Sequence, residues 1–210
     1  MVRLKHVNPP LTMVTRAKIR VLIIYNYTRH LYRIHDMLAE LLPNAEIKVV
    51  DRLHVRTIKW QDYDLIFLTG GNGRHYVLDE RKLKGQRAII KECTKPMIGI
   101  CLGAELMVAT LGGKLHALHK VRRWHIPLHL TEKGEQFIHV PDEFIKVYES
   151  HKIHITEVPD DLEVLATSKD GIEAFRHKQR PMWGVQFHPE VMKRYNHGAH
   201  IVSSALKDIL

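Results

Sequence analysis

The sequence contains little cysteine: Cys93 and Cys101 are the only two among 210 residues. A scaffold held together by several disulfides is therefore excluded, and a reducing compartment such as the cytoplasm is expected. The sequence also lacks an apolar stretch long enough to cross a bilayer and an apolar core of the signal-peptide kind. Internal repeats, low-complexity segments and DNA- or RNA-binding motifs are absent too. We therefore expect a cytoplasmic protein without membrane or nucleic-acid partners.

The composition is that of an ordinary globular protein, with 45% hydrophobic and 26% charged residues. The length suits one domain, which we place at residues 18–210, with residues 1–17 as an extension before it. The formal net charge is +9, and Lys and Arg are concentrated at 81–84 and 120–123. Such a surface attracts an acidic substrate or a nucleotide-binding partner, or it is simply a solvated face.

Apolar runs alternate with helix-spaced segments through the first half of the chain. Strands are predicted at 19–25, 45–50, 65–68 and 97–100, and helices at 30–42, 78–93, 103–111 and 198–210. Further strands predicted at 144–148, 163–167, 172–177 and 182–187 follow one another and indicate antiparallel pairing. This order predicts an α/β fold: an open, mostly parallel sheet flanked by helices, with an antiparallel β-rich C-terminal part. The active site is then expected at the carboxyl ends of the central strands.

The segment Gly99-Ile100-Cys101-Leu102-Gly103 follows the apolar run Pro96–Ile98 and precedes a helical pattern. A small–x–nucleophile–x–small motif between a strand and a helix is typical of a nucleophile elbow, here with cysteine in place of serine. The helix N-terminus would favour the Cys101 thiolate. Taken alone, the motif is equally consistent with a buried cysteine in a strand-to-helix turn.

The segment Gln186-Phe187-His188-Pro189-Glu190 supplies what the cysteine motif lacks. Pro189 disfavours helical backbone at His188, and we expect extended backbone with His188 and Glu190 leaning to the same side. The carboxylate would then hold one imidazole nitrogen while the other faces a nucleophile. Cys101, His188 and Glu190 are therefore predicted to form a Cys-His-Glu triad.

These two motifs together resemble the class I, triad-type glutamine amidotransferase family, and the resemblance covers about residues 19–207. The segments Val147–His151 and Ile172–His177 make the glutaminase part of GMP synthetase the most similar branch. The resemblance implies a flavodoxin-like fold, with Cys101 as nucleophile, His188 as base and Glu190 as the group that orients it. It also implies an oxyanion hole formed by the amides of Leu102 and of Gly71, in the glycine turn after the strand 65–68.

Two positions depart from this family pattern on the substrate side. Relatives usually have glutamine where this chain has Glu105, and an aspartate where it has Ile153. A carboxylate accepts hydrogen bonds but donates none unless protonated. Glu105 is then a harmless exchange on the first helical turn, a changed substrate contact, or a replacement for the missing aspartate. The resemblance implies that Gly70, Glu105, Ser150 and His151 contact substrate.

Four of the 16 histidines, His116, His119, His125 and His129, lie close together in the sequence. Their spacing follows no zinc pattern, and no cysteine or carboxylate joins them on one face. We therefore predict neither a metal site nor a cofactor.

The resemblance implies hydrolysis of the side-chain amide of glutamine through a thioester, with ammonia passed to a separate synthetase subunit because the chain contains no acceptor domain. Glu105 and Ile153 leave a second hypothesis open, a triad hydrolase acting on a γ-glutamyl compound or another amide. A third is a non-catalytic regulatory subunit that kept the fold, against which Cys101, His188 and Glu190 argue.

Overall fold

The computed structural model describes residues 18–71, 80–191 and 196–210. The extension predicted at 1–17, the start of the helix predicted at 78 and the turn residues Asn72 and Gly73 lie outside these ranges. Across the described ranges, no helix is both long enough and apolar enough to span a membrane.

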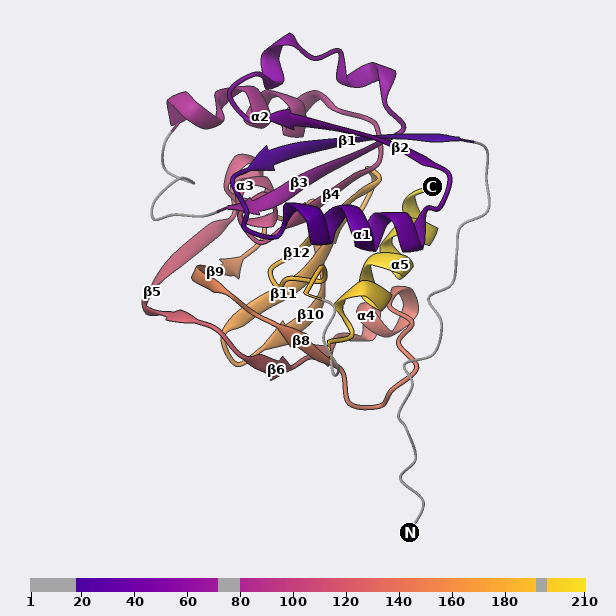
Figure 1. The fold of residues 1–210 in the computed structure, drawn as a ribbon. Coiled ribbons are helices and arrows are strands. Elements are labelled where there is room, and N and C mark those ends of the chain that lie inside the picture. Colours follow the sequence, from indigo (N-terminus) through magenta and orange to yellow (C-terminus); the bar gives the residue numbers. More distant parts are fainter. Residues whose placement is uncertain (1–17, 72–79, 192–195) are drawn as a thin grey trace.

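Parallel strands form one half of a ten-stranded sheet (Figure 1). Their spatial order is β2 (Ala45–Asp51), β1 (Ile19–Asn26), β3 (Leu65–Gly71), β4 (Met97–Ile100) and β12 (Met182–Val185). The three central strands β3, β4 and β12 are buried almost throughout. Their continuous apolar runs are those of parallel strands that helices cover on both faces.

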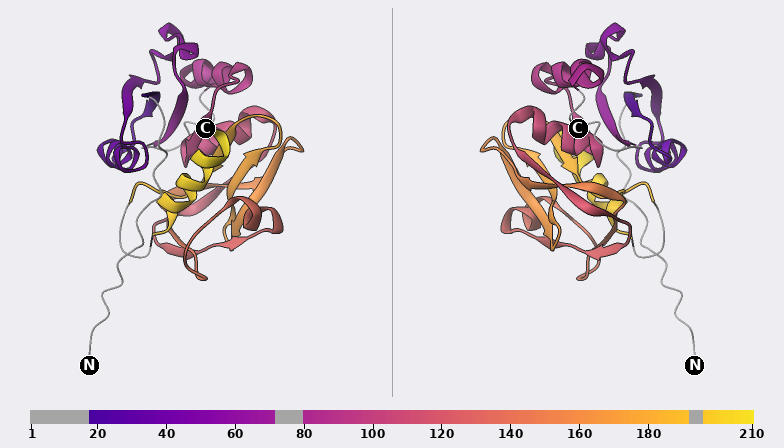
Figure 2. Two further views of the ribbon diagram at one scale, coloured as in Figure 1. Left: turned by 90° about the vertical axis from the view of Figure 1, so that its right-hand side faces the viewer. Right: turned by 90° about the vertical axis from the view of Figure 1, so that its left-hand side faces the viewer.

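Helices cover both faces of this half (Figures 1 and 2). Alternate residues of β1 point to opposite sides. Val21 and Ile23 join a core with α1 (Leu31–Leu41) and α5 (Gly198–Ile209). Leu22 and Ile24 join a second core with α2 (Glu80–Glu92) and α3 (Leu102–Leu111). The helix predicted at the C-terminus therefore packs on the sheet as expected.

The other half of the sheet is antiparallel. From β12 it continues through β11 (Gly171–His177), β10 (Leu162–Ser168) and β7 (His129–Leu130). Beside this path, β9 (His151–Glu157) pairs with β11 and with β5 (Lys114–Arg122). A separate pair consists of β6 (His125–Pro127) and β8 (Lys146–Tyr148), and α4 (Glu132–Phe137) precedes β8 in the chain. Short 3₁₀ turns span Val55–Thr57 and Trp60–Asp62.

The predicted fold class is confirmed, but the structure corrects several elements. The strand predicted at 182–187 ends at Val185 and runs parallel to β4, although it is antiparallel to β11. The strand predicted at 144–148 begins at Lys146, where its pairing with Pro127 of β6 starts, and Phe144 is 80% exposed. Strands β5, β6, β7 and β9 and helix α4 were not predicted. In β5 every residue is exposed or half-buried, so no apolar alternation marks it.

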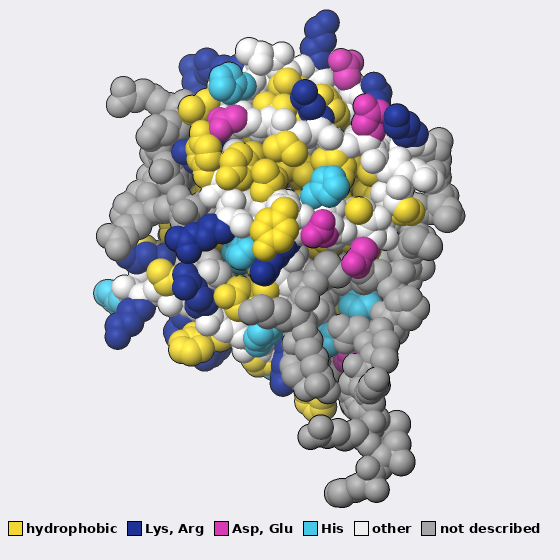
Figure 3. Space-filling view, in the orientation of Figure 1, with side chains coloured by type: hydrophobic (Ala, Val, Ile, Leu, Met, Phe, Trp, Pro, Cys, Tyr) yellow, Lys and Arg dark blue, Asp and Glu magenta, His cyan; other side chains and the backbone are white. Residues whose placement is uncertain are grey.

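The basic segment 120–123 ends strand β5 and faces solvent, with Lys120 and Arg123 exposed. Figure 3 shows Lys and Arg side chains gathered at lower left, the region of β5 and β6 in Figure 1. This part of the positive charge is therefore available to a partner or to solvent.

Candidate active site

Cys101 lies in the turn between β4 and α3, as the elbow motif predicts. Its backbone has φ 49° and ψ −109°, a strained conformation that non-glycine residues adopt mainly at functional sites. Its amide donates to Val185 O at 2.8 Å, which ties the turn to β12. A side chain at Gly103 would overlap with Leu68 O, so the close approach of α3 to β3 requires a glycine there.

His188 and Glu190 follow the end of β12 and lie beside Cys101. His188 Nδ1 lies 2.7 Å from Glu190 Oε1, and the two residues are 4% and 1% exposed. The backbone is a turn rather than the predicted extended segment, with Val191 N donating to His188 O. Asn196 closes it, because its Nδ2 donates to His188 O at 3.0 Å and to Val191 O at 2.7 Å. The turn therefore places the Glu190 carboxylate against one nitrogen of His188, the contact that was expected from extended backbone.

The charges of the three groups depend on one another. Burial disfavours the charged form of His188, but Glu190 and a Cys101 thiolate outweigh it and raise the His188 pKa well above 6.5. Burial raises the pKa of the Cys101 thiol, and Glu105 raises it further, while His188 opposes both. The helix N-terminus was expected to favour the thiolate. In the folded protein the Cys101 pKa is nevertheless raised, and among the neighbouring side chains His188 is the one that favours the thiolate.

The glycine turn after β3 lies against the elbow. A Cβ atom at Gly70 would stand 3.1 Å from His188 Cε1 and 3.5 Å from Cys101 Cβ. A Cβ atom at Gly71 would overlap with the side chain of Leu102. Leu102 opens α3, where backbone amides have no partner within the helix. Both backbone segments predicted to hold an oxyanion therefore border Cys101.

The profile of the family described as "Glutamine amidotransferase class-I" matches residues 22–208. The chain belongs to the class I glutamine amidotransferase family. It is 33% identical to a subunit of glutamine-hydrolyzing GMP synthase from Methanococcus vannielii, over 89% of this chain and 95% of that protein. It is 34% identical to the subunit of the same name from Archaeoglobus fulgidus, over 82% of this chain and 89% of that protein.

Solved structures agree on the fold of this amidotransferase. The crystal structure of a protein described as a GMP synthase subunit, from Thermoplasma acidophilum, superposes with a TM-score of 0.79 at 23% identity, covering 93% of this chain and 96% of that chain. A glutamine amidotransferase from Thermotoga maritima superposes with a TM-score of 0.68 at 22% identity, covering 82% and 76% of the two chains. At these identities the likeness shows the fold alone.

Glu105, one of the two positions expected to depart from the family pattern, is buried next to the cysteine. Its Oε1 lies 4.0 Å from Cys101 Sγ and accepts a hydrogen bond from Gln186 Nε2 at 2.9 Å. Burial raises the pKa of this carboxyl to about 7, although Gln186 and the nearby His151 lower it. Glu105 is therefore a contact of the cysteine, and its charge changes near neutral pH.

The other residues predicted to contact substrate lie at the start of β9. Ser150 is half-buried. His151 is 4% exposed, and its Nδ1 lies 2.7 Å from Ile153 O while its Nε2 lies 3.1 Å from Glu149 Oε1. The His151 ring is thus engaged by residues of its own segment. Gly70 borders the elbow as described above.

Some residues around this site were not singled out from the sequence. Asn26 Nδ2 donates to Thr69 O at 3.0 Å and to Gln86 Oε1 at 3.1 Å, which fixes the end of β3 beneath the glycine turn. Gln186, which binds Glu105, was part of the recognised motif without an assigned role. The signal for Asn26 is a polar residue that ends an apolar strand, which is typical of the edge that carries a site.

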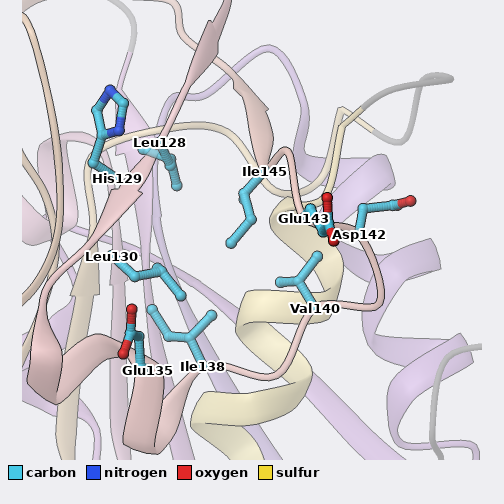
Figure 4. A pocket seen from close by; sticks show the side chains of 9 residues that line it. All are labelled: Leu128, His129, Leu130, Glu135, Ile138, Val140, Asp142, Glu143 and Ile145. Atoms are coloured by element: carbon cyan, nitrogen blue, oxygen red, sulfur yellow. The ribbon is translucent and has the colours of Figure 1, made fainter.

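A surface pocket lies away from these residues (Figure 4). Its walls come from β7, α4 and the chain leading into β8, and they mix apolar and acidic side chains: Leu128, His129, Leu130, Glu135, Ile138, Val140, Asp142, Glu143 and Ile145. It contains no residue that the motifs predict to act on substrate.

Proposed function

We propose that this amidotransferase hydrolyses the side-chain amide of glutamine through a thioester on Cys101 and supplies ammonia to a separate synthetase subunit. The observation that carries the proposal is the buried His188–Glu190 pair, 2.7 Å apart, beside a cysteine in a strained strand-to-helix turn. A base, the group that orients it and a nucleophile are the parts that covalent amide hydrolysis requires.

In the first half of the reaction, the Cys101 thiolate attacks the amide carbon and forms a carbon–sulfur bond. The carbonyl electrons move to oxygen, and the Leu102 and Gly71 amides stabilise that charge. The His188 imidazolium then gives its proton to the amide nitrogen. The carbon–nitrogen bond breaks, ammonia leaves, and a thioester with neutral His188 remains. Glu190 holds the ring in place throughout.

In the second half, neutral His188 removes a proton from water, and the resulting hydroxide attacks the thioester carbon. The same two amides hold the second oxyanion. The carbon–sulfur bond breaks, glutamate leaves, and the Cys101 thiolate with a protonated His188 is restored. The raised His188 pKa suits this cycle, because the imidazolium is the form that must exist before each attack on substrate.

The partner and the compartment are part of the proposal. Relatives at 33% and 34% identity are named as subunits of glutamine-hydrolyzing GMP synthase, and this chain spans 95% and 89% of their lengths. Because these relatives are named as subunits, we infer a separate polypeptide that uses the ammonia. We assign that role to a cytoplasmic synthetase that aminates a nucleotide, and the basic surface around β5 suits an acidic or nucleotide-binding partner.

Ammonia release from glutamine tests the triad. Cys101→Ala is expected to abolish release, whereas Cys93→Ala, which alters a buried cysteine outside the site, is expected to retain it. The assay is run with and without co-purifying protein, since a partner could be needed to complete the oxyanion hole. Retained glutaminase activity in Cys101→Ala would overturn the assignment. Labelling of Cys101 by a glutamine-like electrophile separates an enzyme from a regulatory subunit that only binds.

One observation favours a second substrate class. Glu105 presents a carboxylate 4.0 Å from Cys101 Sγ, at a position where relatives usually present an amide that donates hydrogen bonds. A γ-glutamyl compound or another amide with a donor group at that point would suit the carboxylate. A hydrolysis screen over glutamine, γ-glutamyl peptides and related amides distinguishes the two. Preference for glutamine would exclude the second class.

A further inference from the structure

A cluster of buried polar side chains lies beside the triad, and no step of the proposed reaction uses it, although the family resemblance implied a substrate contact for His151. Glu149, His151 and Glu173 are 0%, 4% and 1% exposed. One ligand atom from each lies within 4.8 Å of the others. In residues 18–71, 80–191 and 196–210, no other group of His, Cys, Asp or Glu side chains brings three ligand atoms this close.

Four polar atoms of the cluster have no hydrogen bond. Neither oxygen of Glu149 has a hydrogen bond of normal geometry, nor does His151 Nε2 or Glu173 Oε2. His151 Nε2 and Glu149 Oε1 are 3.1 Å apart but not aligned as donor and acceptor. Buried carboxylates without partners are costly, so such a group normally carries a ligand, an ion or a shared proton.

The tautomer of His151 is set by its other nitrogen. Ile153 O lies 2.7 Å from Nδ1, and because a carbonyl only accepts, Nδ1 carries the proton. In the neutral ring Nε2 then carries a lone pair and no proton, and it lies 3.1 Å from Glu149 Oε1. A backbone carbonyl on one ring nitrogen is the usual support for a histidine whose other nitrogen binds a metal.

Glu173 has the same kind of support. Ser168 Oγ donates to its Oε1 at 2.9 Å, which leaves Oε2 buried without a hydrogen bond. The surroundings are also short of positive charge. Asp170 is a third buried carboxylate, and it forms an ion pair of 3.0 Å with Arg122. Burial and Glu149 both raise the pKa of Glu173 well above 4.5, so the cluster does not readily hold a second negative charge by itself.

We propose that Glu149, His151 and Glu173 bind a divalent transition-metal ion, for which zinc is the best match. Zinc binds imidazole nitrogen and carboxylate oxygen at about 2.0–2.2 Å, so two ligand atoms on a tetrahedral ion stand about 3.3–3.6 Å apart. The 3.1 Å between His151 Nε2 and Glu149 Oε1 is slightly shorter than this spacing, and its lack of hydrogen-bond alignment fits two ligands that share an ion. The imidazole makes magnesium or calcium a poor match.

The ion would position the catalytic segment without touching substrate. His188 N donates to Tyr148 O, next to Glu149, and Gln186 N donates to Glu173 O, both at 2.8 Å. The metal ligands thus flank the residues that carry the base. An ion between them would clamp β9 and β11 around residues 186–188. This site departs from the sequence-based expectation of no metal.

The test uses the full chain, stripped with a chelator and titrated with zinc chloride against a chromophoric chelator. One tightly bound ion per chain is expected. Glu149→Gln and Glu173→Gln are each expected to weaken zinc binding by at least about tenfold, as is Ser168→Ala, which removes only the support of Glu173. His119→Gln, which removes an exposed histidine of β5, is the matched control and should bind like wild type.

Cobalt absorption of the wild-type chain gives a readout that requires no variant to fold. Visible bands of four- or five-coordinate cobalt with an imidazole ligand are expected, and zinc should displace them. A wild-type chain that retains neither ion after gel filtration overturns the proposal. So does equal zinc affinity in folded Glu149→Gln and wild type, because the bound ion would then lie at surface histidines.

Discussion

Replacing Glu105 by glutamine is expected to stabilise the protein at alkaline pH and to change little in acid. The side chain is 4% exposed, and burial raises its pKa from 4.5 to about 7. The folded state therefore holds this proton more tightly than the unfolded chain does. The associated stability is complete below pH 4.5 and is lost as the pH rises through about 7. The shift of the Glu105 pKa from 4.5 to about 7 corresponds to about 3 kcal/mol of unfolding free energy.

Glutamine at position 105 cannot ionise, so it removes this loss of stability at alkaline pH. It has nearly the shape of glutamate and can keep the contact with Gln186. Its amide oxygen can still accept from Gln186 Nε2, so the hydrogen bond of 2.9 Å is kept. The expected gain over wild type is thus near zero at about pH 4 and approaches about 3 kcal/mol at about pH 9.

Urea unfolding at several pH values measures the difference directly. Glu157→Gln is the matched control, because it removes the same charge from a side chain that is 59% exposed and pairs with Lys114. Its effect should be within about 1 kcal/mol at every pH. A Glu105→Gln protein that is equally stabilised at both ends of the range, or destabilised at alkaline pH, would refute the assigned ionisation.

Four further outcomes are expected. Glu105→Gln should lower the pKa of the Cys101 thiol, seen as faster iodoacetamide alkylation near neutral pH, because a charge 4.0 Å away is worth up to about 4 kcal/mol; an unchanged pH profile would contradict this. Glu190→Gln should reduce kcat by up to about 10⁴-fold with little change in KM, because it removes the carboxylate charge that orients the His188 ring. An unaltered kcat would exclude the triad role of Glu190. Gly70→Ala should reduce kcat by about tenfold or more in steady-state assays, because its Cβ would stand 3.1 Å from His188 Cε1. Gly112→Ala, at φ 99° in open space, should cost only about 1 kcal/mol of stability and no activity.

Much of the fold was predictable because its signals are local. The buried runs of β1, β3 and β4 are continuously apolar, and α1 shows the spacing of a one-sided helix, with Ile34, Met37, Leu38 and Leu41 buried. The exposed strand β5 and the short strands around it carry no such signal, because pairing rather than composition holds them in the sheet.

The candidate site divides in the same way. Cys101, His188 and Glu190 stand in short motifs whose residue types each require a particular chemistry, so they could be named in advance. Glu149 and Glu173 could not be joined, because nothing in the sequence states that β9 pairs with β11. The raised pKa values of the Cys101 thiol and the Glu105 carboxyl could not be predicted from the sequence either, because burial is their largest cause.

The sequence by itself determined the nucleophile turn, the histidine–glutamate pair and an α/β chain with a parallel first half. Only the tertiary structure decided that β12 runs parallel beside β4. That pairing brings His188 to Cys101 and Gln186 to Glu105, whereas the pairing of β9 with β11 brings His151 and Glu173 together. The physical reason is that a strand pairing between distant segments and the dielectric surroundings of a side chain are properties of the packed molecule, whereas a turn motif is set by a few neighbouring residues.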